Sequence, residues 1–181
     1  LRAMCPNSEL KTLEIVRMGK PVTGFSVNVH QTLRNLSLIS CGTFSGYDMP
    51  KLRYLHIRCT TVDFSFTRLM PNIEHLVINR CLMKSEASTA EPFAKLKNLT
   101  RLTTISQDIL RLPSGIKHLD LLNSSSFNHV STPHSIEKLS VSVPRFPVEK
   151  LAVFKMVGKM HIHCGMLKRD VEFGKSVLVQ L

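Results

Sequence analysis

The sequence contains no tryptophan and only 6% aromatic residues, so few side chains are available on which nucleic-acid bases could stack. It also lacks any apolar run near the roughly 18 residues that a membrane-spanning helix needs, because lysine, arginine or proline interrupts every candidate. The chain begins at Leu1 rather than methionine, without the basic and then apolar layout of a signal peptide. These absences disfavour nucleic-acid binding and membrane insertion, and we expect an internal fragment of a longer protein.

Sequence motifs of catalysis are absent as well. The GKS at residues 174–176 resembles the end of a phosphate-binding loop, but that loop needs a glycine where Arg169 stands. No GxSxG, HExxH or paired-carboxylate arrangement occurs, and the 13 acidic residues are dispersed. The sequence therefore predicts a protein that is not an enzyme and that needs no cofactor.

Histidine is present, but not in the spacing of a metal site. His161 and His163 alternate with Ile162, so they would project from the same side of a strand, next to Cys164. A structural zinc site needs four ligands, and no partner motif occurs elsewhere. We therefore expect a pair of exposed histidines and no bound metal.

The five cysteines are odd in number and include no CxxC motif or clustered set. This usage favours a reducing compartment, so we expect a cytoplasmic or nuclear protein. Secretion is the alternative, because Asn35-Leu-Ser, Asn98-Leu-Thr and Asn123-Ser-Ser have the form of N-glycosylation sequons.

What the sequence does contain is an internal repeat. In TLRNLSLISCG, residues 32–42, leucines stand at positions one, four and six and a cysteine at position nine: Leu33, Leu36, Leu38 and Cys41. The same LxxLxLxx(N/C) pattern recurs in LRYLHIRCT and IEHLVINRC, which begin at Leu52 and Ile73. Cys81 again takes position nine, whereas Cys59 comes one place early. These three copies are the best-defined part of the chain.

Weaker copies extend the pattern in both directions, to about eight in all. They begin at Leu10, Leu99, Ile116, Ile136 and Val157. The spacings between successive first positions are 23, 19, 21, 26, 17, 20 and 21 residues, and they scatter about the period of short solenoid repeats. With 43% hydrophobic and 20% charged residues, the chain also has enough apolar material for a core.

The repeat predicts its own architecture. Each copy reads as a short strand whose residues four and six point inward, while residue one packs from the preceding bend. A single copy cannot cover its own apolar face, so neighbouring copies must stack. The linkers are short and rich in proline and glycine, and only residues 82–98 have helical composition. We predict an α/β repeat solenoid with a parallel β-sheet on its concave face and a convex side that is mostly extended or 3₁₀.

Three places fit the pattern poorly. The copy at Leu99 has Thr104 in position six, which predicts a slip or bulge there. VEKLAV, residues 148–153, competes with the copy at Val157 for the register after Ile136. At the end of the chain, Leu178 and Leu181 resemble the opening of a further copy. No polar cap is evident at either end, so we expect a single array over residues 1–181 that lacks both caps.

Residues 10 to about 165 resemble the leucine-rich repeat superfamily. Cysteine in position nine, at Cys41 and Cys81, is similar to the cysteine-containing class found in F-box substrate receptors of ubiquitin ligases. Residues 112–141 instead resemble the short, proline-anchored repeats of amoebal, viral and bacterial-effector proteins, and plant immune receptors carry similarly irregular arrays. The chain departs from the F-box group because it has no F-box segment and its linkers are too short for a helix in each repeat. The resemblance implies a binding module, either in substrate recognition for a ligase or in an innate-immune or surface receptor.

The variable positions two, three, five, seven and eight of each copy are predicted to project from the concave sheet. Across the array they carry ten basic and four acidic residues, about half of the formal net charge of +11. Such a face suits a protein partner with an acidic surface, and a nucleic-acid backbone is the weaker alternative. An exposed face without a dedicated ligand is equally compatible with the pattern. The predicted partner-binding residues lie on adjacent copies: Arg34, Arg53, Tyr54, His56, Arg58, His75, Arg80 and Arg101.

Overall fold

A computed structural model of the chain divides into two compact units, Leu1–Leu99 and Thr100–Leu181. Within them the structure describes residues 10–16, 31–59, 61–79, 81–84, 93, 95–104, 110–122, 130–131, 136–145, 157–166 and 177–180. Among these residues, no helix is long and apolar enough to cross a membrane.

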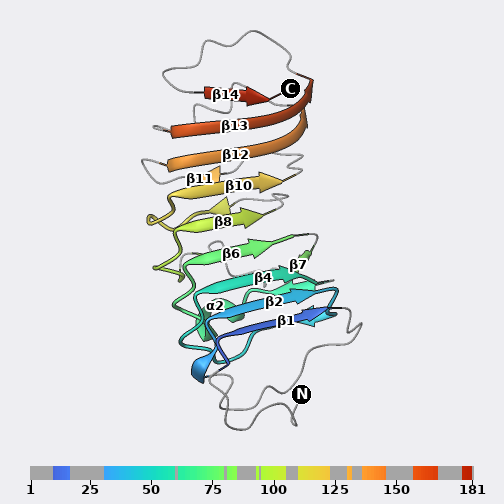
Figure 1. The fold of residues 1–181 in the computed structure, drawn as a ribbon, viewed down its shortest axis with the longest axis vertical. Coiled ribbons are helices and arrows are strands. Elements are labelled where there is room, and N and C mark those ends of the chain that lie inside the picture. The colour runs from blue at the N-terminus through green and yellow to red at the C-terminus, as the bar shows by residue number, and fades with distance from the viewer. Residues whose placement is uncertain are drawn as a thin grey trace. The chain divides into compact units, whose positions relative to one another are not determined.

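Unit 1 is built around four parallel strands in the order β1, β2, β4, β6 (Figure 1). Their bounds are Thr12–Val16, Asn35–Ile39, Tyr54–Arg58 and His75–Ile78. Leu13, Leu36, Leu55 and Leu76, the position-four residues of four successive copies, pair in one row across the sheet. The pairing register therefore follows the irregular repeat spacing, which confirms that each copy forms one strand.

A second parallel sheet in unit 1 contains the shorter strands β3 (Thr43–Phe44), β5 (Thr61–Asp63) and β7 (Leu82–Lys84). Each follows a strand of the first sheet after a few residues, so one copy makes one turn of a solenoid. Between β5 and β6, the chain forms the one-turn helix α2 (Phe66–Leu69). Gly46 has a φ of +99°, and a Cβ there would lie 2.5 Å from the Cβ of Phe66, so only glycine lets the chain pass this close to α2.

The core of unit 1 consists of the repeat positions that the pattern predicts to be buried. Positions one, four and six of the three best-defined copies are all at most 1% exposed: Leu33, Leu36, Leu38, Leu52, Leu55, Ile57, Ile73, Leu76 and Ile78. Phe44, Phe66 and Phe93, which lie outside the template, are also buried. Burial of one such side chain contributes roughly 1.5–3 kcal/mol. A copy therefore depends on its neighbours for most of its stability.

Unit 2 repeats the arrangement. Its five parallel strands follow the order β8, β10, β12, β13, β14, with bounds Arg101–Thr104, His118–Leu122, Ile136–Arg145, Val157–Met166 and Val177–Gln180. The short strands β9 (Leu110–Arg111) and β11 (Val130–Ser131) pair in parallel beside them. Position four again forms one row across β8, β10, β12 and β13, through Leu102, Leu119, Leu139 and Met160.

The structure corrects the expectations at the irregular copies. No slip occurs at Thr104: it is fully buried and pairs with Leu121 in the same register as Leu102 with Leu119. A hydroxyl thus replaces the usual apolar side chain without displacing the strand. Ile136 pairs with Val157, so the copy that follows Ile136 in the sheet is the one that begins at Val157. Residues 148–153 lie outside the described residues.

The last copy was predicted in the wrong register. Val177, not Leu181, pairs with Met160 and so takes position four, while Leu178 pairs with His161. Two leucines three residues apart indicate the register less reliably than the alternation of inward and outward side chains along the strand. In each unit the described residues form a parallel repeat solenoid with little helix, and the segments that return from the strands are short strands and turns.

Candidate functional site

We call the exposed side of β1, β2, β4 and β6 the strand face of unit 1. Because side chains alternate along a strand, the residues between the buried leucines all project to this side. The in-register pairing then places equivalent residues of neighbouring copies next to one another. The result is a set of rows that run across the strands.

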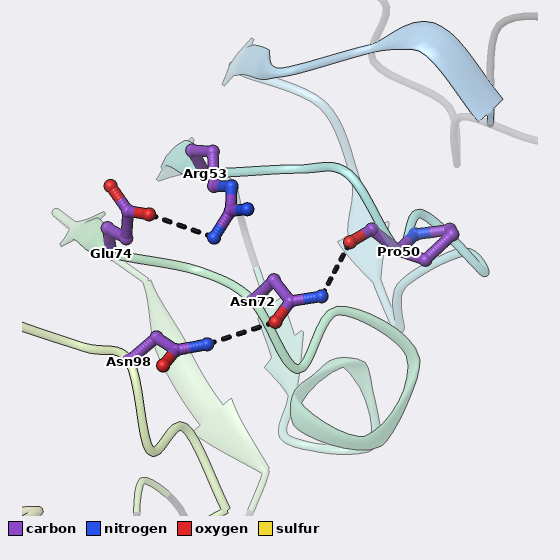
Figure 2. Close-up of polar contacts among 5 residues, drawn as sticks. All are labelled: Pro50, Arg53, Asn72, Glu74 and Asn98. Atoms are coloured by element: carbon purple, nitrogen blue, oxygen red, sulfur yellow. Dashed lines mark hydrogen bonds and ion pairs between the residues drawn. The ribbon is translucent and has the colours of Figure 1, made fainter.

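The first row, just before the strands, joins Lys11, Arg34, Arg53 and Glu74. Backbone N–H groups of Arg53 and Glu74 donate to the carbonyls of Arg34 and Arg53, at 2.8 Å in each case. Figure 2 shows Arg53 Nη1 donating to Glu74 Oε1 at 2.8 Å. Both side chains are about half exposed, so this ion pair contributes little to stability. Its consequence is electrostatic, because Glu74 neutralises one of the arginines predicted to bind a partner.

The second row contains Thr12, Asn35, Tyr54 and His75. Asn35 Nδ2 donates to Thr12 Oγ1 at 3.1 Å, across adjacent strands. The rings of Tyr54 and His75 meet edge to face, with centroids 4.8 Å apart. Both rings are half-buried, which leaves an aromatic pair on β4 and β6 of the strand face for a partner to contact.

The third row contains Glu14, Ser37, His56 and Val77. Ser37 Oγ and His56 Nδ1 are hydrogen-bonded at 3.3 Å. Burial lowers the pKa of His56 below its ordinary value, and Arg58 adds to this, whereas Glu14 opposes it. The imidazole is therefore neutral at pH 7. Because the serine lies between the acid and the histidine, Glu14 does not orient the imidazole as a nucleophile–base–acid relay requires.

The fourth row contains Val16, Ile39 and Arg58. Val16 is 51% exposed and Ile39 is partly exposed, so apolar surface adjoins the exposed guanidinium of Arg58. The strand face of unit 1 thus combines two arginines at its borders, Arg34 and Arg58, with an aromatic pair and neutral polar side chains between them. A face of this composition can hold a partner by contact and hydrogen bonding.

The structure brings six of the eight predicted residues together on this face: Arg34, Arg53, Tyr54, His56, Arg58 and His75. Arg80 lies outside the described residues, and Arg101 begins β8 in unit 2. The sequence reasoning overlooked Asn35 and Ser37, which occupy variable positions three and five and could have been found from the template alone. It also missed the pairing of Arg53 with Glu74, although both stand in position two of successive copies.

Polar side chains in the turns before the strands connect one copy to the next. Thr32 Oγ1 donates to the carbonyl of Leu10 at 3.0 Å. In the equivalent position two copies later, Asn72 Nδ2 donates to the carbonyl of Pro50 at 2.8 Å, and its Oδ1 accepts from Asn98 Nδ2 at 2.9 Å (Figure 2). These bonds fix the spacing of the turns and hence of the rows that follow them.

The cysteines do the same after the strands. The thiols of Cys41, Cys59 and Cys81 donate to carbonyls of the preceding copy, those of Ile15, Leu38 and Ile57. The backbone N–H of Cys59 also donates to the sulfur of Cys81, at 3.2 Å. Burial raises the pKa of Cys59 to about 12, so its thiol stays protonated and unreactive. All three cysteines are free.

No group of three or more His, Cys, Asp or Glu side chains able to hold a metal ion occurs among the described residues. His161 lies on β13 and is partly exposed, whereas the side chains of His163 and Cys164 lie outside the part of the chain that the structure describes.

Comparison with known proteins gives no match: no family model matches the chain, and neither do any of the curated proteins or solved structures.

Proposed function

We propose that the chain is a leucine-rich repeat array that acts as a protein-interaction module, with the strand face of unit 1 as the surface that holds a partner. The observation that carries the proposal is the composition of this face. Arg34 and Arg58 are exposed and have no carboxylate partner among the described residues, and the aromatic pair of Tyr54 and His75 lies between them. Arginine and tyrosine are the side chains most enriched at the energetic centres of protein interfaces.

The charge of the face favours an acidic partner. Its described residues carry four basic side chains against two acidic ones, Glu14 and Glu74, and the latter pairs with Arg53. Arg34 and Arg58 therefore supply the positive potential at the borders, while the neutral His56 and Ser37 lie between them. Complementary potential of this kind raises the rate of association and discriminates against basic partners.

The test is a double charge reversal, R34E/R58E, compared with wild type in quantitative pull-down and in binding to a poly-glutamate peptide. We expect loss of the partners that wild type captures and at least tenfold weaker peptide binding, because two attractions become repulsions. Both arginines are exposed, so the variant should melt at the wild-type temperature.

The matched control is R68E/K95E, which changes the net charge equally. Arg68 is exposed on α2 and Lys95 in a turn, both away from the strand face of unit 1. This control should bind as wild type does. If R34E/R58E retains wild-type capture, or if both double variants lose it equally, the strand face of unit 1 is not the docking surface.

The most specific form of the proposal is substrate recognition by an F-box-type ubiquitin ligase subunit in the cytoplasm or nucleus. Its support is the cysteine class of the repeat, since Cys41 and Cys81 occupy position nine and bond to the preceding copy. An F-box segment in the full-length chain, and co-purification with cullin-type ligase subunits, are the expected findings.

A receptor ectodomain is the second candidate, because Asn98 of the sequon Asn98-Leu-Thr is exposed in a turn. Its amide donates to Asn72, and a glycosylated asparagine keeps one N–H with which to do so. Asn35 is a poorer acceptor because it lies within β2 on the strand face of unit 1. An intact-mass measurement on protein secreted from eukaryotic cells would show an occupied glycan at Asn98 if this second function holds.

A further inference from the structure

Unit 2 carries a second surface with a different charge pattern. Arg101, His118, Lys138 and Lys159 begin or nearly begin four adjacent strands, and they pair in one row across β8, β10, β12 and β13 (Figure 1). We call this set the basic row. Parallel pairing in register puts the charges of Lys138 and Lys159 directly beside one another, at the strand spacing of about 4.8 Å. Such an arrangement is unfavourable unless something acidic lies over it.

The protein neutralises only part of this row. His118 Nε2 lies 3.6 Å from Glu137, whose carboxylate also pairs with Lys117 at 3.1 Å. Lys138 and Lys159 have no ion-pair partner among the described residues. The Nε of Arg101 is buried and has no hydrogen-bond partner within the described part of the chain, although N–H donors of this kind are normally satisfied. Lys138 and Lys159 are thus open to an external acceptor, whereas the buried Nε of Arg101 is not.

The rows on either side limit the width of this surface. Before the basic row stand Thr100, Lys117, Glu137 and Gly158, and after it stand Thr103, Asp120, Ser140 and His161. Glu137 and Asp120 therefore flank the positive charge, and Asp120 Oδ2 already accepts a hydrogen bond from Thr103. A nucleic-acid duplex would bring phosphates against both carboxylates. A single extended chain that lies across the strands over Lys138 and Lys159 would meet fewer of these carboxylates, since Glu137 lies beside His118 and Lys117.

The backbone of β13 approaches that of β12 closely at Gly158. A Cβ at this position would lie 2.8 Å from the backbone oxygen of Glu137, so the chain has a glycine rather than a larger residue here. Apart from the imidazoles of His118 and His161, no aromatic side chain belongs to the basic row or to the rows beside it, so bases of a single nucleic-acid strand would find no tryptophan, tyrosine or phenylalanine ring on which to stack. The flanking carboxylates of Glu137 and Asp120, together with the lack of these larger rings, favour an extended acidic peptide over a nucleic acid.

We infer that the basic row of unit 2 binds an extended acidic peptide segment that runs across the strands. The row spans three strand intervals, about 14 Å, which corresponds to about four residues of extended chain. Because alternate side chains of an extended peptide point the same way, the ligand should carry Asp or Glu at every second residue. This inference extends the proposed function by adding a second surface, and its variants leave the strand face of unit 1 intact.

The experiment measures fluorescence anisotropy of two labelled peptides of equal composition with the full chain at low salt. In one, glutamates alternate with serines. In the other, all glutamates are contiguous. We expect the alternating peptide to bind more tightly, K138E/K159E to weaken its binding about tenfold, and rising salt to weaken it further. The control K95E/K97E, which has the same charge change on exposed turn residues, should bind as wild type does.

Several results would overturn the inference. They are equal binding of the two peptides, equal losses in both double variants, and tighter binding of a single-stranded oligonucleotide than of the alternating peptide. Circular dichroism of K138E/K159E should match wild type, and the single variant K138Q tests the same site if the double variant fails to fold. Loss of alternating-peptide binding in R34E/R58E with none in K138E/K159E would reject the basic row while supporting the proposed function.

Discussion

At the scale of single residues, the fold depends on the leucines and isoleucines at positions one, four and six. In the three best-defined copies they are almost fully buried, and the pairing of the strands places each beside its equivalent in the neighbouring copy. Thr104 shows that this rule tolerates a hydroxyl where the neighbours keep the strand in place. The exposed residues between them define the two candidate surfaces.

Truncation of a position-four leucine tests this directly. We expect Leu55→Ala and Leu76→Ala each to lower the free energy of unfolding by roughly 2–5 kcal/mol, because a fully buried side chain leaves a cavity between copies. Urea denaturation followed by circular dichroism measures the change. Val16→Ala is the control, since its 51% exposed side chain should cost less than about 0.5 kcal/mol. Equal stabilities of L55A and V16A would show that Leu55 is not a core residue.

At the scale of the element, each copy is a strand held between two polar turns. Before the strand, Thr32 and Asn72 bond to the turn of the preceding copy, and after it the cysteine thiols bond to carbonyls of that copy. Without these hydrogen bonds, neighbouring strands from copies of different length would lie at unequal distances from one another. The turns therefore explain how spacings that range from 19 to 23 residues still give one register in unit 1.

The buried thiol of Cys59 predicts that the folded protein loses stability at alkaline pH. Unfolding returns Cys59 from its raised pKa of about 12 to the ordinary 9.0, so the unfolded chain releases a proton that the folded chain retains. Stability from this group is complete below pH 9 and is lost as the pH rises through the interval up to about 12. Urea midpoints measured from neutral to alkaline pH should fall more steeply for wild type than for Cys59→Ala. If the urea midpoints of the two proteins fall equally with pH, Cys59 makes no pH-dependent contribution to stability.

Much of this element-level structure follows from the sequence. The repeat pattern predicted the strands, their buried positions and the register from Leu13 to Leu76, because a two-residue alternation fixes which side chains face inward. The prediction was wrong for the last copy, because it placed that copy by the spacing of Leu178 and Leu181. The structure instead pairs Val177 with Met160, the position-four residue of the preceding strand. The two sheets of short strands were not predicted, since pairs such as Thr43–Phe44 are too brief to show a period.

At the scale of the whole molecule, the candidate surfaces were only partly predictable. Counting charges gave a basic face, but it did not show that Glu74 neutralises Arg53 or that Arg101, Lys138 and Lys159 share a row. Those facts depend on which residues of different copies become neighbours, and this requires the register as well as the template. The solenoid repeats therefore turn a scattered net charge of +11 into ordered rows.

The central claim is that the copies pair in parallel with the stated register, and disulfide trapping measures it directly. Ser37 and His56 are register partners, so S37C/H56C should form a disulfide on mild oxidation, because paired Cα atoms on adjacent strands lie within disulfide reach. S37C/R58C places its cysteines one diagonal apart, beyond roughly 7 Å, and should stay reduced. Mass spectrometry of peptides from non-reduced protein distinguishes the two. Efficient bridging in S37C/R58C but not in S37C/H56C would contradict the register, and with it both binding surfaces.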